Sequence, residues 1–460
     1  MNNRDKWSLI LSNKRFRIQS AQSETDGRNP FENDYGRLIS SSPIRRLQDK
    51  TQVFPLEQSD FTRTRLTHSL EVSYIASSLG QSIEKFLIDN GEIEVEKTGY
   101  LSSLLRVSGL IHDLGNPPFG HFGEDALRHF FLDYFNHKEN NDIGLTDKEI
   151  ADFVNFDGNV QTLRILAKLY YFGDEHGYNL TYSTLSSAIK YPADSLNGNK
   201  GKKAERISEK KFGYFCTEEE IYKKLDEYLQ LNGNRNPVVY LMEAADDIAY
   251  SAADIEDGMK LGIIDYNKIL EIFENNLKEN KEKLMEELTE LNRKYTYGTG
   301  DDQSLVIQKF RISTQRLMIT AVIECFKQNY DQIMQGNFNG ELIKKSSAAD
   351  VRAAYEKLQR IVFDSKSIVK KELAGWEAIY GLLSIFVEAS ESENFKEDGG
   401  NNKESRLFKL LSSSHRYVYS SIEKYPNEKY KRLQLIVDYI SGMTDSYAIN
   451  LFQELKGIKL

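Results

Sequence analysis

The run from His112 to Glu124, HDLGNPPFGHFGE, constrains the fold of this chain more than any other feature. It begins with adjacent His112 and Asp113, two residue types that bind divalent cations. The consecutive prolines after Asn116 remove backbone donors and force the preceding residue out of the helical region, so they must end the helix before them. We therefore expect one helix to end at about His112 and another to begin near His121.

His121 and Glu124 are spaced i, i+3 at the start of this expected helix. That spacing puts both side chains on one face, within hydrogen-bond reach of each other. A carboxylate that holds an imidazole fixes its tautomer and raises its basicity, so the pair can activate a nucleophile or protonate a leaving oxygen. The alternative is that Glu124 only stabilises the helix N-terminus.

Two further segments supply residues that suit a metal site. His68 lies near the start of an amphipathic helix, and Asp246 lies on a helix expected over residues 237–260. Two imidazoles and two carboxylates from separate helices suit Mn, Mg, Fe(II) or Co and leave positions open for water and substrate. Taken alone, His68 would be read as a core histidine, and Asp113 could orient His112 from outside the metal shell. Asp247, about 100° around the helix from Asp246, is the weaker candidate.

Asp246 begins a stripe that continues at Tyr250 and Asp254, spaced i, i+4 and i+8. The aromatic ring could pack on a sugar or a base, and the carboxylate could accept a hydroxyl; the ring could equally be a core aromatic. Arg63 and Arg65 could supply cations, since guanidinium groups bind phosphate oxygens in a planar fork; each could equally be a solvated surface residue.

Composition limits the class of protein. The chain has 460 residues, of which 40% are hydrophobic and 11% aromatic, and this favours an ordered globular protein. Its two cysteines, Cys216 and Cys325, lie far apart, so neither a disulfide framework nor a zinc ribbon is indicated and a reducing cytoplasm fits best. No apolar stretch is long enough for a membrane span. The net charge of −9 disfavours non-specific nucleic-acid binding over the whole surface.

Helical periodicity dominates the chain, so we expect an all-α fold with few or no strands. Residues 1–60 are expected to form an arm of loops and short turns that contributes to the substrate pocket, 61–265 a catalytic core, and 266–460 a helical region that completes the nucleotide pocket and the oligomer contacts. Single helices are expected over 275–294 and 430–455, and minor strands at 178–182 and 295–298. The basic, glycine-rich loop 195–204 is either a solvated insertion or a lid over an anion.

Four strings in the chain carry a resemblance to a known family. The pattern His68, His112-Asp113, Asp246 resembles the HD-domain phosphohydrolases. The fuller strings are similar to the deoxyguanosinetriphosphate triphosphohydrolases, which are related to the vertebrate dNTPase SAMHD. These strings are DKTQVFPL at 49–56, RTRLTHS at 63–69, HDLGNPPFGHFGE at 112–124 and ISGMTDSYA at 440–448.

The resemblance implies a mostly helical fold with the HD-domain catalytic core at 61–265. It also implies that water attacks the α-phosphorus of dGTP, or of another dNTP, and releases a deoxynucleoside and inorganic triphosphate. His121 and Glu124 would be the catalytic pair. One divalent metal per subunit (Mn, Mg, Fe(II) or Co) would be held by four ligands, which are His68, His112, Asp113 and Asp246.

The resemblance also assigns substrate contacts by position. Gln52 and Asp254 match residues that hold the 3′ hydroxyl, and Tyr250 matches the aromatic that leaves no room for a 2′ hydroxyl. The triphosphate contacts are Arg65, Lys190 and Tyr191. Val53 and Asn116, within the quoted strings, are expected to line the same pocket. Glu377 and Arg416 are the candidates for reading guanine.

The expected partners are a dNTP substrate, an allosteric dNTP and single-stranded DNA, with no membrane, in a cytoplasmic homo-oligomer that is a hexamer or a tetramer. Two alternatives remain open at this point. The chain could be an HD phosphohydrolase acting on a cyclic nucleotide or (p)ppGpp, or a non-catalytic regulator that binds nucleotides or single-stranded DNA.

Overall fold

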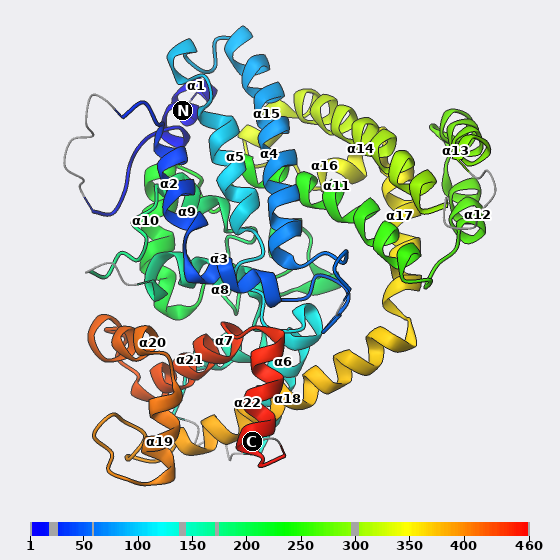
Figure 1. Ribbon diagram of the computed structural model, residues 1–460. Coiled ribbons are helices and arrows are strands. Elements are labelled where there is room, and N and C mark those ends of the chain that lie inside the picture. The colour runs from blue at the N-terminus through cyan, green and yellow to red at the C-terminus, as the bar shows by residue number, and fades with distance from the viewer. Residues whose placement is uncertain are drawn as a thin grey trace.

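The computed structural model describes residues 2–17, 26–57, 59–137, 144–170, 174–295 and 303–458. Within these ranges the chain is helical and forms no strand, and the only ladder contact is an isolated bridge between Thr51 and Thr64 (Figure 1). The all-α expectation is therefore confirmed.

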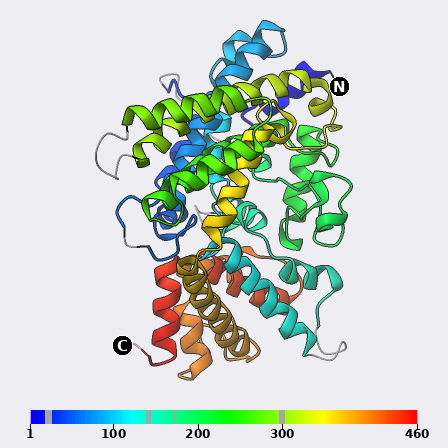
Figure 2. The same ribbon diagram turned by 90° about the vertical axis from the view of Figure 1, so that its right-hand side faces the viewer.

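Three helices form the centre of the first hydrophobic core: α4 (Arg65–Asp89), α5 (Tyr100–Ile111) and α11 (Pro237–Lys260). They lie together in the upper part of the molecule, flanked by α14 (Gln303–Gln328) and α17 (Ala349–Phe363) (Figures 1 and 2). A Cβ at Gly109 of α5 would lie 2.7 Å from the Cα of Ser73 on α4. Glycine at this position therefore allows the backbones of α4 and α5 to pack in direct contact.

A second hydrophobic core lies below the first and contains residues from α6 (Gly120–Asn136), α18 (Lys366–Ser390), α21 (Glu428–Ser441) and α22 (Asp445–Leu455) (Figure 1). Leu127 and Phe131 of α6 and Leu382 of α18 are fully buried in it. The functional residues of α4, α5 and α11 thus belong to one core, and those of α6 to the other.

The structure describes further helices and helical turns. The α-helices are α1 (Asn3–Ile10), α2 (Pro30–Ile39), α3 (Ser42–Arg46), α7 (Asp147–Val154), α8 (Gly158–Arg164), α9 (Tyr182–Ser187), α10 (Glu219–Leu229), α12 (Tyr266–Asn276), α13 (Lys281–Tyr295), α15 (Tyr330–Met334), α16 (Leu342–Lys345), α19 (Lys403–Leu410) and α20 (Ser413–Tyr417). Two π-helical turns cover Ile165–Leu169 and Val418–Ile422. The 3₁₀ turns are Leu47–Asp49, Val95–Lys97, Gly201–Lys203, Ile207–Glu209 and Cys216–Glu218.

Several expectations about individual elements are wrong. The polar stretch after Asn29 was expected to form loops and short helical turns, but it forms α2, a helix of 10 residues, because Asn29 caps it in a capping box and Pro30 occupies its first turn. The helix expected over 275–294 is two helices separated at residues 277–280, and the one expected over 430–455 breaks at 442–444, where Thr444 caps a new helix.

The strand expected at 178–182 is absent, because Thr181 instead caps α9. Of the other expected strand, residues 296–298 lie outside the described residues. In the described parts of the chain, the search for a helix with the length and apolarity to cross a bilayer finds none.

Candidate active site

Three side chains from three helices of the first core converge on one point. The Nε2 atom of His68 lies 3.1 Å from Oδ1 of Asp246, and the Nε2 atom of His112 lies 3.4 Å from the same oxygen. One ligand atom from each residue falls within 4.8 Å of the other two. We call His68, His112 and Asp246 the metal trio.

The trio fits a divalent cation. The Nδ1 atom of His112 donates a hydrogen bond to the carbonyl oxygen of Gly109 at 2.7 Å, which fixes the ring with Nε2 toward the trio. This Nε2 is buried and has no hydrogen-bond partner in the described structure. A buried, unpaired imidazole nitrogen beside a carboxylate costs free energy unless a ligand satisfies it. Two imidazoles and a carboxylate are a donor set that Mn, Fe(II), Co and Zn accept.

Asp113, the fourth expected ligand, lies beside the trio. Its Oδ1 is 3.6 Å from Nε2 of His112, while its Oδ2 forms an ion pair with Arg65. The carboxylate is therefore within reach of a cation held by the trio but is also engaged by a guanidinium. Its role as a ligand stays a prediction.

Burial and charge act against each other in this cluster. Burial alone would raise the pKa of Asp246, but His112 and His68 outweigh it and hold that pKa well below its usual range. Burial alone would lower the pKa of His112, but Asp113 and Asp246 outweigh it and raise it. The carboxylates are thus ionised, and the cluster is built to hold positive charge.

His121 and Glu124 form the expected pair at the start of α6. The Nδ1 atom of His121 donates to Oε2 of Glu124 at 3.0 Å, and Oε1 of Glu124 accepts the backbone N–H of Gly158 at 2.8 Å. Glu124 is only 1% exposed, whereas the His121 side chain is 80% exposed. Glu124 raises the pKa of His121. The pair therefore combines a fixed carboxylate with an imidazole whose Nε2 is directed away from it.

The turn before α6 brings this pair close to Arg65. Phe119 and Gly120 both adopt positive φ angles, of 61° and 58°, which turn the chain sharply after the two prolines. A Cβ at Gly120 would lie 2.5 Å from Nη2 of Arg65. Arg65 therefore packs on the residue next to His121 while it pairs with Asp113.

Four cations near the site are each held by an aspartate. Besides Arg65 with Asp113, the pairs are Lys190 with Asp246 at 4.0 Å, Lys211 with Asp157, and Arg352 with Asp247 at 3.0 Å. Such pairing orients the cationic groups before any anionic ligand arrives.

The basic loop 195–204 precedes Lys211 in the chain. Its backbone forms hydrogen bonds with the backbone of residues 209 and 210. The role of this loop as a lid stays a prediction.

Tyr250 and Asp254 occupy the rest of the α11 stripe. The hydroxyl of Tyr250 donates to Oδ1 of Asp247 at 2.7 Å, and the guanidinium of Arg352 lies 4.9 Å from the centre of its ring. Asp254 is buried and accepts from Nε2 of Gln359 at 2.9 Å. Burial raises the pKa of Asp254 to about 7. The ring is thus held on two sides, which suits a rigid steric wall.

The other expected substrate residues have varied surroundings. Gln52 has a buried Oε1 without a partner among the described residues, and Val53 and Asn116 are buried. The ring of Tyr191 lies 5.3 Å from the guanidinium of Arg235. These placements are compatible with a pocket wall, and the assignments stay predictions.

The two candidates for guanine recognition lie in the second part of the chain. Glu377 is exposed on α18, and Arg416 on α20 pairs with Glu397. Nothing in these contacts links either residue to the metal trio, so they also stay predictions.

Sequence reasoning missed Lys211, Arg352 and Gln359. Arg352 and Gln359 lie on α17, about a hundred residues after α11, and only packing of α17 against α11 brings them to Tyr250 and Asp254. Their i, i+7 spacing puts them on one helix face, but that signal does not say which helix they meet.

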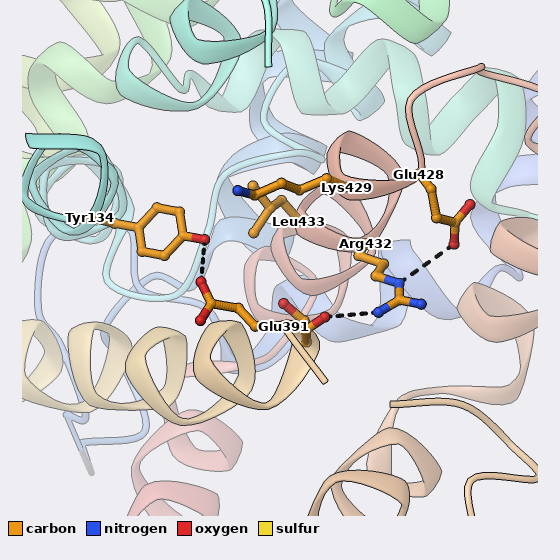
Figure 3. Close-up of a pocket in the computed structure, with 7 residues that line it drawn as sticks. Tyr134, Glu391, Glu428, Lys429, Arg432 and Leu433 are labelled. Atoms are coloured by element: carbon orange, nitrogen blue, oxygen red, sulfur yellow. Dashed lines mark hydrogen bonds and ion pairs between the residues drawn. The ribbon is translucent and has the colours of Figure 1, made fainter. Parts of the chain in front are cut away.

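A separate cavity of about 340 Å³ lies at the junction of α6, α18 and α21 (Figure 3). Its polar side chains hold one another: Tyr134 donates to Glu391 at 2.8 Å, and Arg432 lies 3.6 Å from Glu428. None of the metal trio lines it.

Comparison with known families gives two matches. Residues 65–167 match the HD domain, and residues 349–454 match the phosphohydrolase-associated domain. The first range contains His68, His112, Asp113, His121 and Glu124. The second contains α17 to α22.

Comparison with curated proteins gives relatives of the same length. A deoxyguanosinetriphosphate triphosphohydrolase-like protein of Listeria monocytogenes is 40% identical over 471 residues, which cover 98% of this chain and 100% of the relative. A protein of the same description from Synechocystis sp. is 31% identical, over 99% of this chain and 100% of the relative. The deoxyguanosinetriphosphate triphosphohydrolase of Salmonella paratyphi A is 31% identical, over 97% of each chain.

Proposed function

The chain belongs to the HD-domain deoxyguanosinetriphosphate triphosphohydrolase family and is a metal-dependent phosphohydrolase with a nucleotide substrate. On this premise we propose that it hydrolyses dGTP, or another dNTP, to a deoxynucleoside and inorganic triphosphate. In this reaction the oxygen of water bonds to the α-phosphorus and the bond from that phosphorus to the 5′ oxygen breaks. The 5′ oxygen leaves with a proton.

The observation that carries the proposal is that Arg65 contacts a residue beside the metal trio and a residue beside His121. Its Nη1 pairs with Asp113, and its Nη2 packs against Gly120. Its Nε is buried without a partner in the described structure. A phosphate bound to Arg65 would therefore have the trio on one side and the imidazole on the other.

His121 is proposed to move the proton. Because Nδ1 is held by Glu124, Nε2 is the nitrogen that faces substrate. Glu124 raises the pKa of His121 and so favours the protonated ring, which can donate from Nε2 to the 5′ oxygen as it leaves. Glu124, fixed by the N–H of Gly158, stabilises the charged ring and sets its orientation.

His68, His112 and Asp246 would hold the metal, with Asp113 as the proposed fourth ligand. The chemistry that a divalent cation supplies in such a site is Lewis acidity toward a phosphoryl oxygen. Among the described residues, the buried Nε2 of His112 has no hydrogen bond and lies 3.4 Å from Oδ1 of Asp246, so a cation between them would satisfy both atoms.

The triphosphate is proposed to lie along the paired cations, Arg65, Lys190, Lys211 and Arg352. Preorganised cations stabilise charge that develops in the transition state without reorganising during the reaction. Tyr191 would pack beside the phosphates.

Selection for a deoxyribose is proposed to rest on Tyr250. Its ring is held by Asp247 and Arg352, so it would not move aside for a 2′ hydroxyl. Asp254 and Gln52, each with a buried oxygen, would hold the 3′ hydroxyl, and Val53 and Asn116 would line the pocket.

Other features implied by the family stay predictions. They are the identity of the metal, a hexameric or tetrameric assembly, activation by a second dNTP, binding of single-stranded DNA and the cytoplasmic location.

The test is product analysis. The purified protein is incubated with Mn²⁺ and each dNTP, singly and in pairs, and with GTP, and products are separated by anion-exchange chromatography. Deoxyguanosine and triphosphate from dGTP alone would support a simple dGTPase, and activity only in mixtures would support an activator site. A sample treated with EDTA is the control and should be inactive.

The remaining outcomes would contradict the proposal. Phosphate, pyrophosphate or a nucleoside monophosphate as product would move the protein to another branch of HD phosphohydrolases. Retained nucleotide binding without turnover in any mixture would favour a binding regulator.

A further inference from the structure

The string ISGMTDSYA at 440–448 has no role in the reaction proposed above. It joins α21 to α22 in the second core and lies inside the phosphohydrolase-associated match. Although it is more than 300 residues from the catalytic strings in sequence, its side chains contact two of them.

Asp445 makes these contacts. It is 2% exposed, and both of its carboxylate oxygens are used. Oδ2 accepts the backbone N–H of Thr51 at 2.9 Å and also the hydroxyl of Thr51. Oδ1 accepts the backbone N–H of Phe119 at 3.0 Å. A single carboxylate therefore joins the arm at residue 51 to the turn at residue 119.

Each end of this bridge lies beside a residue of the site. Thr51 directly precedes Gln52, whose buried Oε1 lacks a partner in the described structure. Phe119 has a φ of 61°, a conformation that residues with a Cβ adopt only when the surroundings impose it. That turn starts α6 and places His121 two residues later.

Neighbouring residues repeat the same connection. The ammonium of Lys50 donates to the carbonyl oxygens of Asn116 at 2.6 Å and of Ser441 at 2.8 Å. The hydroxyl of Ser446 donates to Asp49 at 2.9 Å. Three successive residues of the arm, 49 to 51, thus contact the 440–448 string.

We propose that Asp445 is a positioning residue that holds the Phe119 turn, and through it His121, in register with the substrate arm. The proposal deepens the proposed function, because it assigns to the phosphohydrolase-associated part of the chain a role at the catalytic pair. Asp445 acts through His121 and touches neither substrate nor metal.

The test uses Asp445→Asn in the full-length, Mn²⁺-loaded protein. An amide has one acceptor oxygen and one donor nitrogen, so it cannot accept hydrogen bonds from both Thr51 and Phe119. Displacement of His121 should lower kcat by about 100-fold, with KM within about threefold of the parent. In a His121→Ala background the same substitution should change the residual rate by less than about threefold, because residues that act as a unit are not additive.

Two further measurements separate positioning from general damage. Amide hydrogen exchange of the unliganded protein should be faster at residues 119–124 in Asp445→Asn, while the rest of α6 is unchanged. Ser446→Ala is the matched control, since it loses one arm contact on the same helix but leaves Asp445 intact; it should keep kcat and the exchange pattern.

The outcomes are distinguishable. Unchanged amide exchange at residues 119–124, or a loss of rate in the His121→Ala background as large as in the parent, would overturn the role of Asp445. Absence of turnover in the parent would overturn the proposed function alone, because the exchange measurement needs no activity.

Discussion

The two hydrophobic cores contribute different parts of the site. The first core supplies the metal trio, in which His68 and His112 are buried; His68 lies on α4, Asp246 on α11, and His112 directly follows α5. The second core supplies α6, whose buried face holds Glu124 while the His121 ring stands 80% exposed. The proposed metal ligands are fixed by the packing of one core. His121, the proposed proton-transfer group, is instead positioned by Glu124, by Arg65 of the first core and by the turn that Asp445 of the second core holds.

This difference separates two tasks. Holding a cation requires several atoms at constant distances, which a packed core supplies. Transferring a proton to a substrate oxygen requires an accessible ring in one orientation, and here Glu124, Gly158, Arg65 and Asp445 provide that orientation. We therefore expect substitutions in the trio to remove the metal, and substitutions around His121 to slow the reaction while the metal stays.

The largest effect is expected for Asp246→Ala. Asp246 is the carboxylate that both histidines approach, so its removal should empty the metal site and abolish turnover. Metal content after gel filtration, measured by mass spectrometry, checks this. The matched control is Asp247→Asn, which changes the adjacent carboxylate that faces Arg352 and should retain the metal. Full metal content in Asp246→Ala would refute the ligand assignment.

A smaller effect is expected for Glu124→Gln, with turnover reduced by about 100-fold at neutral pH and the metal retained. Since Glu124 raises the pKa of His121, activity that needs the protonated ring is present below that pKa and is lost as pH rises through it. Removing the carboxylate lowers the pKa, so the loss should begin at lower pH. The pH profile of kcat/KM measures this shift. If kcat/KM of Glu124→Gln falls at the same pH as that of the parent, His121 is not the titrating acid.

A selectivity change is expected for Tyr250→Ala. Opening the wall beside C2′ should reduce the preference for dGTP over GTP by about 10- to 100-fold. Competition assays with both nucleotides give the ratio of kcat/KM for dGTP to kcat/KM for GTP. Tyr250→Phe keeps the ring and loses only its hydrogen bonds to Asp247 and Arg352, so it should keep most of the preference. If the ratio in Tyr250→Ala equals that of the parent, the steric wall lies elsewhere.

The smallest effect concerns stability. Burial raises the pKa of Asp254 to about 7 in the folded protein, above its ordinary value of 3.8. A raised carboxyl pKa means that folding is favoured at low pH and weakened as pH rises from about 4 to about 7, by less than about 1.4 kcal/mol per pH unit. Asp254→Asn should flatten this part of the profile when the free energy of unfolding is measured in urea between pH 4 and pH 7. If the free energy of unfolding changes with pH equally in the variant and the parent, Asp254 is not the group that causes the pH dependence.

Local patterns predicted the parts of the site that lie on one element. The i, i+3 spacing of His121 and Glu124, the break after Asn116 and the choice of Asp246 over Asp247 all follow from helix geometry, and the structure has each of them. The all-α class followed from the same periodicity.

Contacts between distant elements could not be predicted in this way. Periodicity shows which face of α17 carries Arg352 and Gln359 but not that this face meets α11. The polar composition of residues 1–60 suggested loops, yet Trp7 and Phe31 are fully buried in the first core, because a few large side chains can anchor a polar segment. The bridge from Asp445 to Thr51 and Phe119 depends on the folding of the whole chain.

The central claim is that metal binding and proton transfer belong to separate parts of the molecule. The most direct measurement is Mn²⁺ bound per chain, titrated by electron paramagnetic resonance in His121→Ala, together with turnover of dGTP by the same samples. The account predicts binding equal to that of the parent and turnover lower by about 10²- to 10⁴-fold. Loss of Mn²⁺ from His121→Ala, or turnover close to that of the parent, would contradict it.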